Sequence, residues 1–375
     1  MFGKSFLAFR ASRGRARRAL SGGPPHGYTG RPNPSGASPI PIARPASEIL
    51  VIKLSALGNV VLSFGPFAAI RRHHPDARIT VLTTAPYADW LSRAPWFDRV
   101  WAAGRPEWWD LAGLLRLRRR LRGGGFARVY DLQTSGRSSR YFQLFPRDAR
   151  PEWSGIAPGC SHPDRDPRRD SLHDMDRQIG QLRQAGITNF PPPDLSWCTA
   201  DLAPFALPAR FALPNRFALL VPGSSAHRPG KRWPEAAFAR LAAALAAEGI
   251  TPVILGTAGE ASLGRAIAAA APAIDLTGRT QIGALAALGR RAVFAVGNDT
   301  GPMHLLAAAG CPSVVLFSGE SDPALCAPRG RAVTVLRRPL LADLPVEAVR
   351  AALAGLPDAL DLPGALDLPG ALDSP

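Results

Sequence analysis

Three loops carry the side chains that could do chemistry, and each follows an apolar run and precedes a helix-like segment. They are SALGN at residues 55–59, PGSSAHRPGKRWP at 222–234 and VGNDTGP at 296–302. A helix that starts after a strand presents unpaired backbone N–H groups and the positive end of its dipole, which together favour phosphate. The third loop in particular therefore suits a phosphorylated ligand.

The third loop has two interpretations. In the first, Asp299, Thr300 and Gly301 contact a ligand at the end of the apolar run, and His304 faces it from the first helical turn. In the second, Asp299 or Thr300 only caps the helix, with Pro302 in its first turn. Spacing alone does not choose between them.

The second loop combines small residues with a compact cation. Ser224 and Ser225 can donate hydroxyl hydrogen bonds, and Lys231 suits a phosphoryl oxygen. Arg232 stands where a Walker A loop requires Ser or Thr, so this is not that motif. The alternative is a basic surface turn.

The first loop lacks G-x-G-x-x-G, which disfavours a dinucleotide-dependent dehydrogenase, and Asn59 could simply cap a helix. Two runs of His and Asp, at 162–166 and 173–176, have ligand-like residues close together. We expect solvated polar linkers there rather than metal sites. The four cysteines show no C-x-x-C spacing, and no G-x-S-x-G elbow supports a serine hydrolase.

The elements that must position these loops alternate between strands and helices, which indicates parallel βαβ units. The predicted strands are 49–54, 78–82, 99–101, 127–130, 217–223, 251–256, 273–278, 291–299 and 312–319. The predicted helices are 60–74, 108–124, 171–187, 234–249, 260–271, 282–290 and 301–310. Residues 151–170 break the pattern, and we expect a domain boundary near 195–213. Two such domains usually bind ligands in the cleft between them, at the carboxyl ends of the strands.

The charge is uneven along the 375 residues. The net charge is +16, of which residues 1–46 carry +8 and residues 354–375 carry −4, so the body carries +12. Such a basic body favours anionic partners. We expect 1–46 to be a disordered basic tail, although its Arg-rich start also resembles a transit peptide. The repeated LPGALD unit of 354–375 indicates a second, low-complexity tail.

Taken in order, four features resemble glycosyltransferase family 9, the heptosyltransferases of lipopolysaccharide core assembly. They are IKLSALGNVVLSFGP at 52–66, DLQ at 131–133, and the segments 222–234 and 296–310. The resemblance covers about residues 48–350. It implies an α/β protein of GT-B type, with two Rossmann-like doubly wound domains facing a central cleft. Residues 47–200 would bind the acceptor and residues 201–353 the nucleotide sugar.

The resemblance also implies roles for particular residues. Lys231 would stabilise the leaving diphosphate, and Glu260 would bind the ribose hydroxyls. The complete donor-binding set is Ser224, Ser225, Arg228, Lys231, Glu260, Asp299, Thr300, Gly301 and His304. The acceptor-binding set is Gly58, Asn59, Asp131, Gln133, Arg137 and Arg140.

One position departs from the family pattern. The first loop of the family usually reads S-x-G-D, and its Asp is the proposed general base, whereas here that position is Asn59. An amide cannot take the proton. Three explanations remain open. Another carboxylate, such as Asp131, could reach the acceptor, or Asn59 could only orient the hydroxyl. Alternatively, the protein could bind its ligands without turnover. We favour retained transferase activity because the donor loops are intact.

The implied partners are an ADP-sugar substrate and an anionic glycolipid acceptor, with no metal and no cofactor. The family places such an enzyme in the cytoplasm, with peripheral contact at the inner membrane. The basic segment 111–122 fits a phosphorylated acceptor, or is a solvated charged face. Nucleic acid is not expected, because half of the net positive charge lies in 1–46 and no aromatic stacking motif appears.

Overall fold

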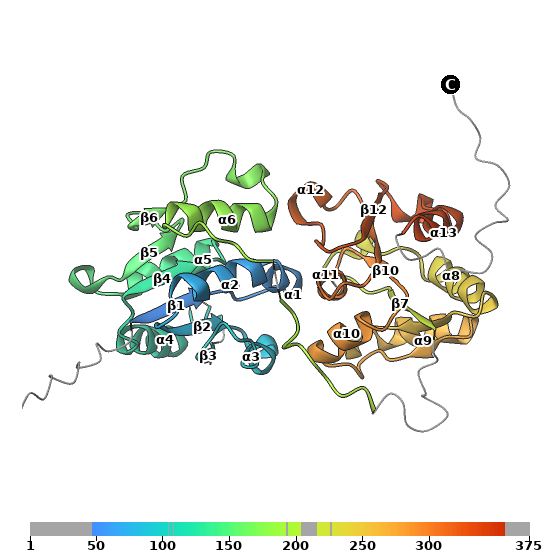
Figure 1. Ribbon diagram of the computed structural model, residues 1–375, viewed down its shortest axis with the longest axis horizontal. Helices are drawn as coiled ribbons and strands as arrows, with labels where there is room; N and C mark the ends of the chain where they lie inside the picture. The colour runs from blue at the N-terminus through green and yellow to red at the C-terminus, as the bar shows by residue number, and fades with distance from the viewer. Residues whose placement is uncertain are drawn as a thin grey trace, which may run out of the picture. The chain divides into compact units, whose positions relative to one another are not determined.

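The computed structural model describes residues 47–103, 105–107, 109–192, 194–203, 216–225 and 227–356. The predicted tail 1–46, and 357–375 of the second tail, lie outside them. From Ala46 onward the chain forms one compact unit. Within it are two sheets of six strands, each interleaved with helices (Figure 1).

The first sheet has the order β3-β2-β1-β4-β5-β6, and every pairing in it is parallel. Its strands are β1 (Glu48–Ile52), β2 (Arg78–Thr83), β3 (Arg99–Ala102), β4 (Arg128–Asp131), β5 (Glu152–Gly155) and β6 (His162–Pro163). Its helices are α1 (Leu57–Val61), α2 (Phe64–His73), α3 (Ala85–Leu91), α4 (Leu111–Gly123), α5 (Gly136–Arg140) and α6 (Asp174–Gln184).

The second sheet has the order β12-β11-β10-β7-β8-β9 and is also parallel. Its strands are β7 (Phe217–Val221), β8 (Thr251–Ile254), β9 (Ile274–Asp275), β10 (Ala295–Asn298), β11 (Ser313–Phe317) and β12 (Val333–Arg337). Its helices are α8 (Glu235–Ala247), α9 (Ala261–Ala270), α10 (Ile282–Gly289), α11 (Gly301–Ala308), α12 (Pro323–Cys326) and α13 (Val346–Ala354). We call the parts built on the first and second sheets the N-terminal and C-terminal lobes.

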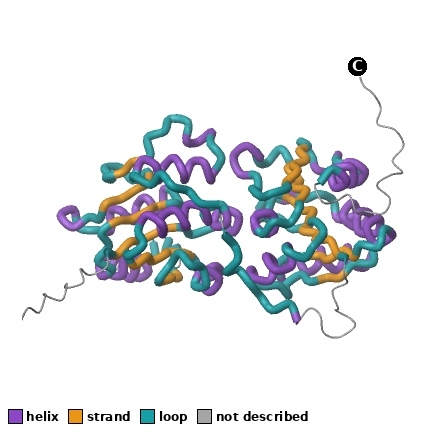
Figure 2. The backbone as a smooth tube through the Cα atoms, viewed as in Figure 1, coloured by secondary structure: helices purple, strands orange, loops and turns teal. Residues whose placement is uncertain are grey.

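The central strands are buried on both faces, as their unbroken apolar runs predict. β1 and β7 each place four or five consecutive side chains in the interior. Separate apolar clusters cover one face of each sheet, and a third cluster includes side chains from both lobes. The alternation of strands with helices is visible along each sheet in Figure 2.

The structure confirms the two parallel α/β sheets and adds elements that the sequence analysis missed. Residues 151–170 contain β5 and the two-residue β6, although we expected a break there. The predicted helix 60–74 is two helices, α1 and α2, and β12 and α13 extend the second sheet and its cover. Leu356 is buried, so the body continues past the predicted end at residue 353.

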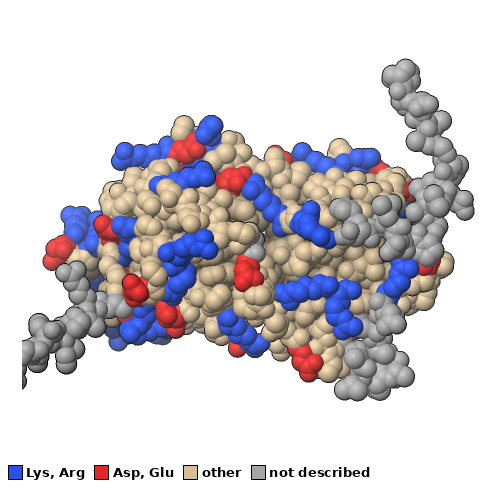
Figure 3. Space-filling model, in the orientation of Figure 1, with Lys and Arg blue, Asp and Glu red and all other residues tan. Residues whose placement is uncertain are grey.

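None of the described helices is both long and apolar enough to cross a bilayer. Basic and acidic side chains are both scattered over the face shown in Figure 3, with more blue than red. This agrees with the excess of arginine in the sequence.

Candidate functional site

The second and third loops converge at the carboxyl ends of β7 and β10. Lys231 Nζ lies 2.6 Å from Asp299 Oδ2, and both side chains are largely buried. Asn298 joins the two loops: its Oδ1 accepts from Trp233 N at 3.0 Å, and its Nδ2 donates to Pro222 O at 2.7 Å. Asn298 was not among the residues predicted from the sequence, although its place directly before Asp299 was the available signal.

These groups border a pocket of about 710 Å³ that both lobes line. It contains eight of the residues predicted from sequence: Gly58, Asn59, Ser225, Lys231, Asp299, Thr300, Gly301 and His304. It also contains side chains that the sequence analysis missed, Tyr87, Thr257, Thr280 and Cys326 among them. The pocket therefore gathers most of the predicted donor-binding residues and the first loop.

The capping alternative for the third loop holds in position but not in hydrogen bonding, and the one for Asn59 does not hold. Thr300 occupies the N-cap position of α11, but its side chain makes no capping hydrogen bond. Asp299 pairs with Lys231 instead. Asn59 lies inside α1, whose N-cap is Ala56, and so does not cap that helix.

Two glycines allow the lobes to approach each other beside this pocket. A Cβ at Gly58 would lie 2.7 Å from His304 Cδ2, and one at Gly301 would lie 2.7 Å from Leu57 Cβ. Both distances are too short for a side chain, so α1 and α11 pack closely only because these positions are bare.

His304 lies against the first loop with only 5% of its surface exposed. Burial lowers the pKa of its imidazole to about 4, so the ring is neutral near pH 7. Its Nδ1 has no hydrogen-bond partner among the described residues. A neutral imidazole in the wall of the pocket can donate one hydrogen bond from one ring nitrogen and accept one at the other.

Three other predicted donor residues do not line the pocket. Glu260 accepts from Thr257 N at 2.7 Å and from Thr257 Oγ1 at 2.9 Å, so it holds a lining residue rather than lining the pocket itself. Ser224 accepts from Arg232 Nε at 3.2 Å. Arg228 donates to Glu320 O at 3.4 Å on the surface.

The predicted acceptor-binding set is not gathered in the pocket. Gln133 Oε1 accepts from Leu54 N at 2.8 Å and from Ser55 N at 3.2 Å, so it fixes the first loop from behind. Arg137 pairs with Glu107 at 3.1 Å, and Arg140 is exposed at the end of α5. Only Gly58 and Asn59 of this set line the pocket.

Asp131 is completely buried, and burial raises the pKa of its carboxyl to about 7. Its Oδ1 accepts from Thr134 N at 3.1 Å, while its Oδ2 has no partner among the described residues. The carboxylate does not line the pocket, so in this conformation it cannot reach an acceptor there. The sequence could not predict the burial of Asp131, because β5 and α6, which follow later in the chain, enclose this side chain.

Lys53 is a buried cation that the sequence analysis did not use. Its Nζ donates to Leu132 O at 3.0 Å and lies 3.7 Å from Asp174 Oδ2. Burial lowers the pKa of this lysine, against the pull of Asp174. Both residues of this pair come from the N-terminal lobe, and neither lines the pocket.

The His and Asp runs are occupied by other partners. Asp164 pairs with Arg169 at 2.9 Å, and Asp176 with Arg329 at 2.8 Å. His173 Nδ1 accepts from Met175 N, so its Nε2 donates to Ala327 O at 2.9 Å. Across the described ranges, no three His, Cys, Asp or Glu side chains are placed to hold a metal ion.

Comparison with known proteins agrees with this geometry. The model of glycosyltransferase family 9 (heptosyltransferase) matches residues 114–346, more than half of the chain. Lipopolysaccharide heptosyltransferase 2 of Salmonella typhimurium is 27% identical over 314 residues, 77% of this chain and 88% of the relative. Lipooligosaccharide heptosyltransferase 2 of Haemophilus influenzae is 30% identical over 115 residues, which span only a third of its length.

Solved structures share the fold. The Escherichia coli ADP-heptose lipopolysaccharide heptosyltransferase II superposes with a TM-score of 0.66 at 23% identity, covering 84% of this chain and 98% of that one. A family 9 glycosyltransferase of Veillonella parvula gives 0.69 at 21% identity, covering 82% and 96%. The E. coli heptosyltransferase WaaC with ADP gives 0.64 at 20% identity, covering 81% and 98%. The expected GT-B type fold is confirmed.

Proposed function

We propose, from the premise that this chain belongs to glycosyltransferase family 9, the heptosyltransferase family, that it transfers a heptose or related sugar from an ADP-linked donor to a lipopolysaccharide core acceptor. The observation that carries the proposal is the Lys231–Asp299 pair in the wall of a pocket lined by both lobes. Its volume of about 710 Å³ is in the range of small-molecule sites. The bound ADP in a solved relative supports the choice of donor.

The residues suit stabilisation of a leaving diphosphate. An acceptor hydroxyl attacks the anomeric carbon from the face opposite ADP, which inverts that centre, and negative charge grows on the diphosphate as the bond to it breaks. The proton of the hydroxyl passes to water, because Asn59 cannot take it. Lys231 and the N-terminus of α11 are already held in place, which is electrostatic preorganisation. Asp299 holds the lysine in position and has an oxygen left for sugar hydroxyls.

In this proposal, the C-terminal lobe binds the donor and the N-terminal lobe binds the acceptor. Gly58 and Asn59 are the acceptor-side residues at the pocket, and Thr257 lines it at the position that Glu260 supports. Glu260 then acts on the ribose either through Thr257 or after a change of rotamer.

The second candidate is a family member that binds donor or acceptor without turnover. Asn59 favours it, because the amide lies in the pocket where the family has a carboxylate and Asp131 is enclosed elsewhere. A general base contributes about 10²–10⁴-fold to such a step.

Turnover of ADP-heptose with a deacylated lipopolysaccharide core acceptor distinguishes the two candidates. We expect measurable transfer by the wild type and a higher kcat for Asn59→Asp. Activity that appears only in Asn59→Asp would favour the binding protein. No transfer, no ADP binding and no binding of the acceptor by either protein would refute both.

A further inference from the structure

An exposed apolar cluster stands at the start of α4 in the N-terminal lobe. Trp109 is 63% exposed, Leu111 69% and Leu115 53%. Only one other large apolar side chain of the described residues is as exposed, Leu340 at 64% in the C-terminal lobe. Three neighbouring exposed large apolar groups on a basic element are a common mark of an interaction surface.

The inner and outer faces of α4 carry different side chains. Leu117 and Leu121 point into the core, while Leu111 and Leu115 lie one turn apart on the outside. The outer face continues from Leu115 into arginines: Arg116, Arg118, Arg119 and Arg122 are all exposed. We call Trp109, Leu111, Leu115, Arg116, Arg118, Arg119 and Arg122 the α4 patch.

The charge of the α4 patch is not neutralised by neighbouring groups. Arg116, Arg118 and Arg119 form no ion pair or hydrogen bond with any residue that the structure describes. The nearby acids are used elsewhere, since Glu107 pairs with Arg137 and Asp110 caps α4 by accepting from Gly113 N at 2.8 Å. The patch therefore presents net positive charge beside apolar side chains.

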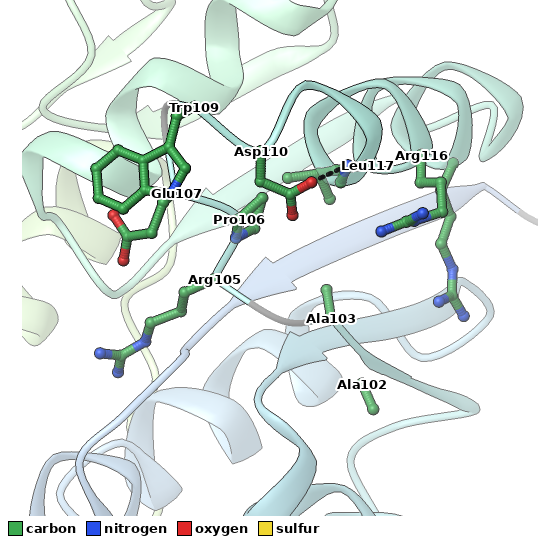
Figure 4. Close-up of a pocket in the computed structure, with 11 residues that line it drawn as sticks. Ala102, Ala103, Arg105, Pro106, Glu107, Trp109, Asp110, Arg116 and Leu117 are labelled. Atoms are coloured by element: carbon green, nitrogen blue, oxygen red, sulfur yellow. Dashed lines mark hydrogen bonds between the residues drawn. The ribbon is translucent and has the colours of Figure 1, made fainter.

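The arginines beside the patch do not converge on one small ligand. A hollow of about 410 Å³ lies between α4 and residues that precede it, among them Arg105, Glu107 and Trp109. Figure 4 shows Arg105 and Arg116 on opposite sides of it, with Trp109 on the loop. Separated cations beside an apolar cluster suit an extended anionic surface better than a single phosphate.

We propose that the α4 patch docks the protein on an anionic lipid bilayer, with Trp109, Leu111 and Leu115 in the interfacial region and the arginines on lipid phosphates. Amphipathic helices with arginine beside Trp and Leu bind bilayers in this way, and each basic side chain near an anionic leaflet adds to the affinity. The inference depends on the proposed function in one respect only: the function supplies a glycolipid acceptor for the docked enzyme.

The test is sedimentation of the full chain with vesicles of phosphatidylglycerol and phosphatidylcholine, against vesicles of phosphatidylcholine alone. We expect binding to the anionic vesicles that weakens at least about 10-fold in Leu111→Ser/Leu115→Ser and in Arg118→Glu/Arg119→Glu. The matched controls are Leu340→Ser and Arg240→Glu/Arg265→Glu, which change exposed residues of the C-terminal lobe. We expect both controls to bind as the wild type does.

Equal weakening by Arg240→Glu/Arg265→Glu, or unchanged binding in both patch variants, would overturn the proposal. The second result would assign any vesicle binding to other cations, such as those of residues 1–46. A change of oligomeric state in the patch variants, without a change in vesicle binding, would instead assign the patch to a second copy of the chain.

ADP binding of the same variants separates this inference from the proposed function. Patch variants that bind ADP as the wild type does, but not vesicles, support the docking surface. A wild type that binds vesicles through the patch but never binds ADP would refute the proposed function and leave the docking surface intact.

Discussion

The two lobes have the same strand order and each holds a lysine close to an aspartate, but they expose these groups differently. In the N-terminal lobe, the side chains of Lys53 and Asp174 are 2% and 9% exposed, with Nζ 3.7 Å from the carboxylate. In the C-terminal lobe, Lys231 and Asp299 are 12% and 8% exposed, 2.6 Å apart, and they line a pocket. Of the two pairs, only the second lines this pocket.

The difference arises at the carboxyl ends of the corresponding strands. β4 ends at Asp131, which α6 and β5 cover, and the polar network there includes Gln181, whose Nε2 donates to Asp131 O at 3.1 Å. β10 ends at Asn298, which ties down the neighbouring loop and leaves the next residue, Asp299, at the pocket. One fold thus uses the same strand end for internal support in one lobe and for a candidate site in the other.

The largest expected effect comes from breaking the enclosed pair. Lys53→Met leaves Asp174 with Arg177 and Gln178 but removes its buried lysine and the bond to Leu132 O. Loss of one partner of a buried pair costs about 3–5 kcal/mol, so we expect about 4 kcal/mol less stability in urea unfolding. Equal stability of Lys53→Met and wild type would mean that the network is not structural.

A second effect follows from the pKa of Asp131. Since folding raises this pKa from 3.8 to about 7, the folded state holds its proton more tightly, and stability falls as pH rises from about 4 to about 7. His74 and His304, whose pKa values are lowered to about 4, give the opposite slope over this window. The difference between wild type and Asp131→Asn isolates the carboxyl.

We expect Asp131→Asn to gain on the order of 3 kcal/mol relative to the wild type between pH 4 and pH 8. Urea unfolding of both proteins across that range measures it. A difference that stays flat with pH would contradict the raised pKa, and one that falls would reverse its sign.

A smaller effect tests the contact between the lobes. Gly58→Ala places a methyl group against His304, where overpacking costs about 1–3 kcal/mol, so we expect about 2 kcal/mol of destabilisation. Gly180→Ala in α6 is the matched control, because a Cβ there meets nothing within 4 Å. We expect that control to gain up to about 1 kcal/mol from helix propensity. Equal stabilities for the two variants would show that α1 and α11 separate easily.

The sequence predicted those parts of the fold and site that depend on local pattern. Apolar runs followed by turns located β1, β2, β7, β8, β10 and β11, and residues of the loops at 222–234 and 296–302 were assigned to one donor-binding set. It missed β6, which has only two residues, and β12, whose half-buried side chains lack an unbroken apolar run.

Burial imposed by distant segments could not be predicted. Nothing local in DLQ shows that Asp131 is enclosed or that the Gln133 side chain is occupied by the first loop. Similarly, the role of Asn298 depends on a bond to Trp233, which is 65 residues away. Residue types therefore identified the candidates, and long-range packing decided which of them reach the pocket.

The most direct test of the central claim is isothermal titration of ADP into the wild type and Lys231→Met, with Arg240→Met as an exposed control in the same lobe. A hydrogen bond to a charged group contributes about 1.5–3 kcal/mol, so the dissociation constant should rise about 10–100-fold in Lys231→Met alone. The same dissociation constant in all three proteins, or no ADP binding by the wild type, would contradict a diphosphate site at the Lys231–Asp299 pair.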